Sequence, residues 1–265
     1  LGMSVGRLEL MTGIRERRIV EEGQTIRHLS GDALRQALKN AGMEAKHLDM
    51  VLLATLTPQM ICPTTAAQVV ADLGASPAAA MDVNAACSGF VYALNLAAGM
   101  VESGRCRTVG VIGAEVLSSI TDWKDRRTCI LFGDGAGAAV LTASDDPDQG
   151  CLYQEMASDG NLWAELYCPR SAQDLPPDDK IFSGAYNTLQ MTGQAIFKFA
   201  VSTLRSVVAA EHVVVAATLS GKLKTISQIV AIWAPVGQHQ LGEFGRLEPL
   251  LPWVALSVSV SSGIE

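Results

Sequence analysis

One cysteine, Cys87, is placed where a side chain can act as a covalent nucleophile. It lies in the segment 82–90, which reads DVNAACSGF. The apolar run 78–83 before it predicts a buried strand, and the helical spacing of apolar residues after it predicts a helix over 88–102. A thiol at the start of a helix meets unpaired N–H groups and the positive end of the helix dipole, which favour the thiolate. Because the thiolate is the nucleophilic form, we interpret Cys87 as a candidate catalytic residue; the alternative is a small buried thiol of the core.

Around this segment, runs of strand character alternate with runs of helical character. Strands are predicted over 50–54, 78–83, 108–113 and 138–141, and helices over 30–42, from Thr64 or Thr65 to 73, and over 88–102. Strands that alternate with helices predict a mostly parallel sheet with helices on both faces. Loop-forming residues are concentrated from 144 to 179, which indicates a connection between two halves of the fold.

Glycines at positions 133, 135 and 137 precede the predicted strand 138–141. A dinucleotide-binding fingerprint would instead follow a strand and open a helix, so this pattern gives such a site little support. We interpret these glycines as residues that allow tight turns and a close approach of the backbone.

Composition and charge narrow the class of protein. The net charge of −7 argues against a nucleic-acid partner, since phosphate binding needs clustered positive charge. No apolar run reaches the roughly 18 residues of a membrane span, and the N-terminus lacks the layout of a signal peptide. The six cysteines include no Cys-x-x-Cys pair, so we expect neither a metal site nor a disulfide framework. These features predict a cytoplasmic protein.

Three ordered motifs resemble β-ketoacyl-acyl-carrier-protein synthase III, a condensing enzyme of the thiolase-fold family. They read TGIRERR at 12–18, DVNAACSGFVYAL at 82–94, and DRRT at 125–128 continued by LFGDGAGAAVL at 131–141. The likeness extends over about residues 10–203. It implies an α/β fold, a thiolase-like five-layer αβαβα sandwich built from two similar halves. Residues 1–143 would form the half that carries the nucleophile, and residues 144–265 a linker and an atypical or incomplete second half.

The resemblance also assigns expected roles to residues outside the cysteine segment. Arg126 matches an arginine that contacts coenzyme A, and His239, which precedes Gln240, is the candidate for the family's catalytic histidine. The alternative for His239 is a surface histidine. Arg15, Arg17 and Arg18 are either an exposed basic cluster or further contacts to the phosphates of coenzyme A, which arginines bind well.

Several family features are absent from this sequence. No asparagine follows Asn187, so the family's Gly-Asn-Thr-Ser motif is missing, and Met11 stands where the family has an arginine. The chain also begins after the family's first strand. Either a diverged protein or a disrupted reading frame would explain the tail.

The activity implied by the resemblance is a decarboxylative condensation. Cys87 would take the acyl group of an acyl-CoA primer, and malonyl-acyl carrier protein would then extend it, starting fatty acid or related polyketide synthesis. The expected partners are acyl carrier protein, acyl-CoA and a second copy of the chain in a homodimer, with no metal or redox cofactor. The alternative function is a catalytically impaired acyl-binding, CoA-binding or dimer-partner protein of the same fold.

Overall fold

The computed structural model describes residues 9, 12–144, 150, 154 and 156–211. The chain divides into two compact units, Arg17–Met191 and a second unit of Leu1–Glu16 with Thr192–Glu265. The expected boundary between halves at residues 143 and 144 stays a prediction.

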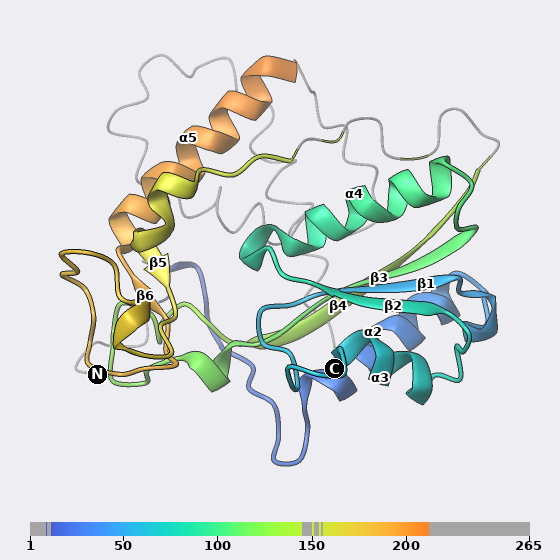
Figure 1. The fold of residues 1–265 in the computed structure, drawn as a ribbon, viewed down its shortest axis with the longest axis horizontal. Helices are drawn as coiled ribbons and strands as arrows, with labels where there is room; N and C mark the ends of the chain where they lie inside the picture. Colours follow the sequence, from blue (N-terminus) through green and yellow to red (C-terminus); the bar gives the residue numbers. More distant parts are fainter. Residues whose placement is uncertain (1–8, 10–11, 145–149, 151–153, 155, 212–265) are drawn as a thin grey trace. The chain divides into compact units, whose positions relative to one another are not determined.

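A four-stranded sheet is the centre of the larger unit (Figure 1), with the order β2-β1-β3-β4. Its strands are β1 (Met50–Ala54), β2 (Ala79–Val83), β3 (Thr108–Val116) and β4 (Asp134–Thr142). β1 pairs in parallel with both β2 and β3, whereas β4 is antiparallel to β3. The predicted mostly parallel sheet is therefore confirmed, and the carboxyl ends of β1, β2 and β3 lie at the same edge.

Helices cover both faces of this sheet, as predicted. α2 (Ile26–Asn40) and α3 (Thr65–Asp72) lie on one face, and α4 (Gly89–Glu102) lies on the other (Figure 1). The alternation of side chains along β1 supplies both cores, because successive residues of a strand point to opposite faces. The core under α2 and α3 includes Leu34, Leu38, Val51, Leu53, Val69 and Ile112. The core under α4 includes Leu52, Ala54, Ala93, Ala97, Val109 and Val111.

The first helix begins earlier than its sequence pattern predicted. The predicted range 30–42 assigned the cap to Ser30, but α2 spans Ile26–Asn40 with Thr25 as its N-cap. The Thr25 backbone N–H donates to Nδ1 of His28 at 3.1 Å, which satisfies this end of the helix. Ser30 is fully buried within α2 and does not cap it.

β4 begins at Asp134 rather than at the predicted residue 138, so Gly135 and Gly137 lie within a strand. Only Gly133, just before it, meets a close neighbour: a Cβ there would lie 3.0 Å from the Arg18 carbonyl oxygen. The interpretation as a close backbone approach is confirmed at Gly133, and the strand position of the other two glycines contradicts a nucleotide fingerprint.

The remaining elements are short apart from one helix. In the larger unit, β5 (Leu166–Tyr167) pairs antiparallel with β6 (Gln190–Met191). Turns of 3-10 type span Ala45–His47, Ala86–Ser88, Leu117–Ile120, Gly160–Glu165 and Ala172–Asp174. The smaller unit contributes α5 (Gly193–Glu211). None of the helices among the described residues combines the length and apolarity that a membrane crossing requires.

Candidate functional site

Cys87 lies in the 3-10 turn Ala86–Ser88, between β2 and the first residue of α4. Its place at a strand-to-helix junction is as predicted, and the residue is exposed. Ala86 before it has a φ of 45°, the left-handed region that costs a residue with a Cβ about 1–2 kcal/mol. Such backbone strain is concentrated at functional sites, where the surrounding structure enforces it.

The surrounding structure holds this turn at the carboxyl edge of the sheet. β1 ends at Ala54, which is in register with Val83 of β2 and with Gly113 of β3. The backbone N–H of Thr55 donates to the Val83 carbonyl at 3.1 Å, so the ends of β1 and β2 remain joined beyond the ladder. In parallel α/β sheets, ligands bind at this edge.

Two glycines bring the start of α4 close to the strands. A Cβ at Gly89 would lie 3.2 Å from the Ala54 Cβ, and a Cβ at Gly113 would lie 3.0 Å from Cδ2 of Phe90. Both contacts are shorter than ordinary packing distances, so the absence of a side chain permits the approach. The Thr55–Val83 hydrogen bond before the turn and the close packing of Gly89 after it thus fix both ends of the turn that carries Cys87.

The electrostatic surroundings of the thiol differ from the sequence-based expectation. The pKa of Cys87 is raised above its ordinary value, chiefly because nearby protein atoms displace water from the thiol and secondly because of the Glu115 carboxylate. Its own backbone N–H acts in the opposite direction. The residue is exposed at the surface, yet the thiol itself is crowded. Burial of the thiol and the charge on Glu115 therefore both disfavour the thiolate that the start of a helix would favour.

Glu115, near the end of β3, is a residue of this edge that the sequence analysis did not identify. It is half-buried, and burial raises the pKa of its carboxyl group. The carboxylate accepts hydrogen bonds from the Thr57 hydroxyl at 2.5 Å, the Leu56 N–H at 2.9 Å and the Thr55 hydroxyl at 3.2 Å. The available signal was an acidic residue at the end of an otherwise apolar strand, where burial needs hydrogen-bond partners.

Arg126 lies on the segment that leaves the carboxyl end of β3, after the turn Leu117–Ile120. Its side chain is exposed. The neighbouring acid, Asp125, instead pairs with Arg127 at 2.9 Å. Within the described part of the chain, Arg126 has no ion pair, so its guanidinium is available to an anion.

The N-terminal arginines have structural contacts. Arg15 pairs with Glu9 at 2.6 Å in the smaller unit. In the larger unit, the Arg17 guanidinium donates to the Ile130 carbonyl, and the Arg18 carbonyl accepts from the Asp134 N–H at 2.7 Å. These contacts give Arg17 and Arg18 a structural role that neither alternative, an exposed basic cluster or phosphate binding, had predicted. His239 and His212 lie outside the described residues.

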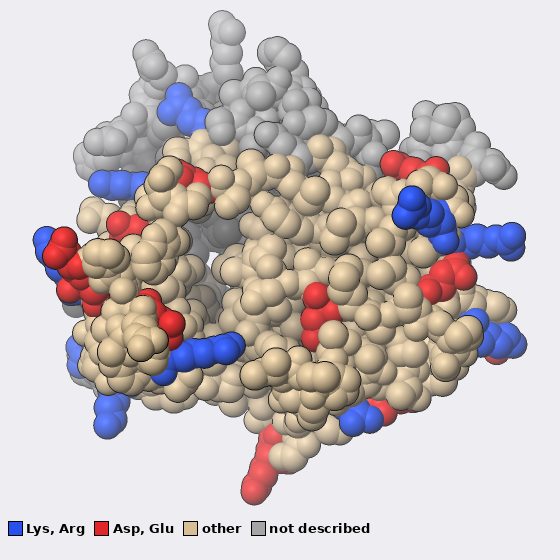
Figure 2. All heavy atoms as spheres, viewed as in Figure 1, with Lys and Arg blue, Asp and Glu red and all other residues tan. Residues whose placement is uncertain are grey.

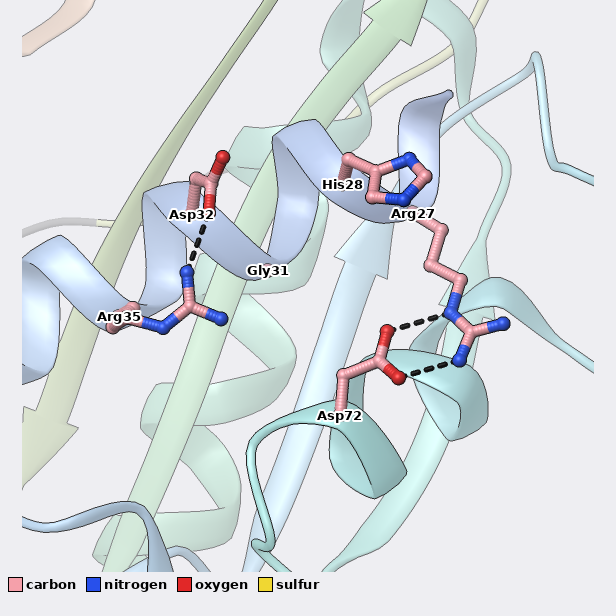
Figure 3. A pocket seen from close by; sticks show the side chains of 6 residues that line it. All are labelled: Arg27, His28, Gly31, Asp32, Arg35 and Asp72. Atoms are coloured by element: carbon pink, nitrogen blue, oxygen red, sulfur yellow. Dashed lines mark hydrogen bonds and ion pairs between the residues drawn. The ribbon is translucent and has the colours of Figure 1, made fainter. Parts of the chain in front are cut away.

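A hollow of about 400 Å³ is lined by residues of α2 and α3 and by none of the predicted site residues (Figure 3). It is lined by Arg27, His28, Gly31, Asp32, Arg35 and Asp72. Arg27 of α2 reaches Asp72 of α3, with Nε 2.6 Å from one carboxylate oxygen, and Arg35 pairs with Asp32. Positive and negative side chains are also interspersed over the face drawn in Figure 2. Because its arginines are paired, the hollow has little capacity for an anionic ligand.

Comparisons with known proteins identify relatives in the family that the sequence motifs resemble. Residues 81–160 match the family described as 3-oxoacyl-[acyl-carrier-protein (ACP)] synthase III. The chain is 45% identical over 195 residues to the β-ketoacyl-[acyl-carrier-protein] synthase III of Caldanaerobacter subterraneus subsp. tengcongensis, which covers 74% of this chain and 59% of that protein. Against the protein of the same name from Bordetella petrii, the identity is 47% over 193 residues, or 73% of this chain and 56% of that one.

Solved structures give the same result. The crystal structure of 3-oxoacyl-[acyl-carrier-protein] synthase III from Aquifex aeolicus VF5 matches with a TM-score of 0.70 and 39% identity, over 78% of this chain and 62% of that one. The priming β-ketosynthase of the R1128 polyketide pathway matches with a TM-score of 0.67 and 35% identity, over 76% and 59% of the two chains. The resemblance and the thiolase-type α/β fold are confirmed. The chain spans somewhat less than two thirds of the length of the curated relatives it matches.

Proposed function

We propose that this chain, a homologue of β-ketoacyl-acyl-carrier-protein synthase III over about three quarters of its length, carries the nucleophile of a decarboxylative condensing enzyme. The reaction joins an acyl-CoA primer to malonyl-acyl carrier protein. The observation that carries this proposal is the position of Cys87, in a strained turn at the carboxyl ends of three parallel strands. The likeness to named synthases supports the chemistry.

The first half-reaction is transfer of the acyl group to Cys87. The sulfur forms a bond to the thioester carbonyl carbon, the bond from that carbon to the sulfur of coenzyme A breaks, and the cysteine proton ends on the released thiol. The Cys87 backbone N–H would donate to the oxyanion of the tetrahedral intermediate, a type of contact worth about 3 kcal/mol in other enzymes.

The second half-reaction extends the acyl group. Malonyl-acyl carrier protein loses carbon dioxide, and the electron pair left on its α-carbon attacks the carbonyl of the acyl-cysteine. The Cys87 sulfur leaves, which gives 3-ketoacyl-acyl carrier protein. His239 stays the predicted hydrogen-bond donor to the developing oxyanion and lies outside the described residues. The residues named here supply the nucleophile and the anion contacts without a metal or redox cofactor.

Arg126 is proposed to bind the phosphates of coenzyme A. Its exposed guanidinium is not used by Asp125, and the planar fork of an arginine matches phosphate oxygens. Arg126 lies in the segment between β3 and β4, which leaves the sheet at the carboxyl end of β3 and returns to it at Asp134.

A homodimer is proposed at β2, an edge strand of the described sheet. The exposed apolar side chains near it are those of Met81 on the strand and Val91 at the start of α4. Pairing with β2 of a second copy would satisfy the unpaired edge and cover these side chains. An obligate interface of this kind buries upwards of about 2,000 Å².

The experiment that tests the function uses the purified chain, a panel of acyl-CoA primers and malonyl-acyl carrier protein. We expect a 3-ketoacyl product that requires both substrates and disappears in Cys87→Ala. The preferred primer then separates a fatty acid enzyme from a polyketide priming enzyme. Binding of acyl-CoA without any product would contradict the condensation and favour the acyl-binding alternative.

A further inference from the structure

We propose that Glu115 is a positioning residue for Cys87: its carboxylate fixes the loop after β1, on which the Cys87 turn is packed, and presents a negative charge to the thiol. This inference rests on the proposed role of Cys87 as the nucleophile. It concerns a side chain that the condensation described above does not use.

Where the backbone pairing of β1 with β3 ends, hydrogen bonds to the Glu115 side chain take its place. The pairing of β1 with β3 stops at Ala54 and Gly113, while β3 continues to Val116. Beyond that point, the Leu56 N–H donates to the Glu115 carboxylate at 2.9 Å and the Val116 N–H donates to the Thr57 hydroxyl at 2.9 Å. The loop is therefore held to β3 by side chains.

The same loop supports the turn that carries the nucleophile. Thr55, which is buried, donates its hydroxyl to Glu115 and its backbone N–H to the Val83 carbonyl. Hydrogen bonds thus link Glu115 through Thr55 to the Val83 end of the Cys87 turn. Ala54, the residue before Thr55 and the last of β1, packs against Gly89 at the other end.

Burial is the larger cause of the raised pKa of Cys87, and Glu115 is the charged side chain that adds to it. The loop 55–59 carries no ionisable side chain. Asp82 of β2 accepts the Thr65 and Ala66 N–H groups at the start of α3 instead. Glu102 lies at the far end of α4.

This arrangement has a consequence for acyl transfer. A negative charge beside the sulfur disfavours the thiolate but has no such effect on the uncharged acyl-cysteine, so it favours the acylated state over the free thiolate. A thiolate of higher pKa is also intrinsically more nucleophilic. The charge on Glu115 thereby favours the protonated thiol and the acyl-enzyme over the free thiolate.

The test is the pH profile of Cys87 alkylation by iodoacetamide, followed by peptide mass mapping. In Glu115→Gln, which keeps the size of the side chain and one acceptor oxygen, we expect the midpoint to move to lower pH. At a pH below the original midpoint, the alkylation rate should rise several-fold. Glu102→Gln removes a similar charge from α4 and should leave the midpoint in place, and the exposed Cys62 and Cys168 are internal controls. A midpoint that stays in place or rises in Glu115→Gln overturns the proposal.

A second pair of variants tests the positioning itself, including the case in which Glu115→Gln does not fold. Thr57→Val removes the shortest hydrogen bond to Glu115 but keeps the charge, and Thr57→Ser keeps the hydroxyl. We expect the plateau rate of Cys87 alkylation to change in the valine variant and to recover in the serine variant. Equal plateau rates of alkylation in the native chain, Thr57→Val and Thr57→Ser would refute the positioning role. Alkylation needs no acyl-CoA, so failure of the proposed function, a thiol that alkylates but is never acylated, is distinguishable from failure of this inference.

Discussion

The backbone N–H of Thr55 donates to the carbonyl of Val83 at 3.1 Å, and this bond joins two strands just before the turn that carries Cys87. Because the Thr55 hydroxyl also donates to Glu115, one residue connects all three parallel strands at their carboxyl ends. The proposed nucleophile therefore depends on the hydrogen bonds at these strand ends, and changes there should alter its reactivity.

Gly113→Ala tests whether close packing under α4 positions the turn. A Cβ at this residue would lie 3.0 Å from Cδ2 of Phe90, so Phe90 and the start of α4 must shift. We expect a loss of about 1–3 kcal/mol in the free energy of unfolding and a slower reaction of Cys87 with iodoacetamide. Urea unfolding and alkylation kinetics measure both effects. The control is Gly137→Ala in β4, where a Cβ would meet nothing within 4 Å, and equal losses in the two variants would contradict the packing argument.

Arg126→Ala tests the proposed contact with coenzyme A. Hydrogen bonds between a charged donor and a phosphate contribute about 1.5–3 kcal/mol, so binding of acyl-CoA should weaken roughly 10- to 100-fold. Isothermal titration with acetyl-CoA measures the affinity, and raising the salt concentration should reduce the difference between the two proteins. The exposed Arg105, beyond the end of α4, gives a matched control. Unchanged affinity in Arg126→Ala would remove Arg126 from the site.

Asp49, at the amino ends of β1 and β3, provides a test of how the stability of the fold depends on pH. The backbone N–H groups of Thr108 and Arg107, at 2.9 and 2.6 Å, hold the pKa of Asp49 below its ordinary value. The stabilisation is therefore present above the unfolded pKa of about 3.9 and is lost as the pH falls through the lower folded pKa. Asp49→Asn should be less stable than the native chain near neutral pH, with a difference that shrinks in acid.

Urea unfolding of both proteins at about pH 7 and about pH 2.5 measures this difference. Asp32→Asn, on the exposed surface of α2, controls for the loss of one charge. A difference that grows in acid would contradict the assigned direction.

The edge strand β2 offers a test of the homodimer. Met81 is 38% exposed on this strand, and a lysine there would place a charge in the proposed interface. We expect Met81→Lys to shift the mass measured by light scattering from dimer to monomer. Lysine at the exposed Ile19, which lies off the sheet, should leave the mass unchanged. A native chain that is monomeric at micromolar concentration would refute the dimer.

Much of the fold follows from local pattern. The apolar runs predicted β1 at its observed bounds and β2 to within one residue. β1 is buried, because a parallel strand covered on both faces needs a continuous apolar stretch. The burial predicted for the strand at 78–83 is wrong, since β2 lies at the edge of the described sheet and its residues are exposed or half-buried. The start of α2 was missed because Thr25 is capped through His28, a pairing that the usual capping residues do not suggest.

The candidate site was only partly predictable. The motif placed Cys87 correctly at a helix start, but the opposing influence of Glu115 arises from residues distant in sequence that meet at one edge of the sheet. Hydrogen bonds from Thr55 and Thr57 to Glu115 have no local signature, since each joins residues about sixty positions apart. Arg126 was identified by resemblance, and its availability follows from the Asp125–Arg127 pair.

The most direct test of the central claim is the intact mass of the protein after incubation with acetyl-CoA and longer acyl-CoA donors. We predict the addition of a single acyl group, mapped to the peptide that contains Cys87 and absent in Cys87→Ser. An unmodified protein with a free Cys87 thiol and the expected circular dichroism spectrum, or an acyl group on any other residue, would contradict the assignment of Cys87 as the nucleophile.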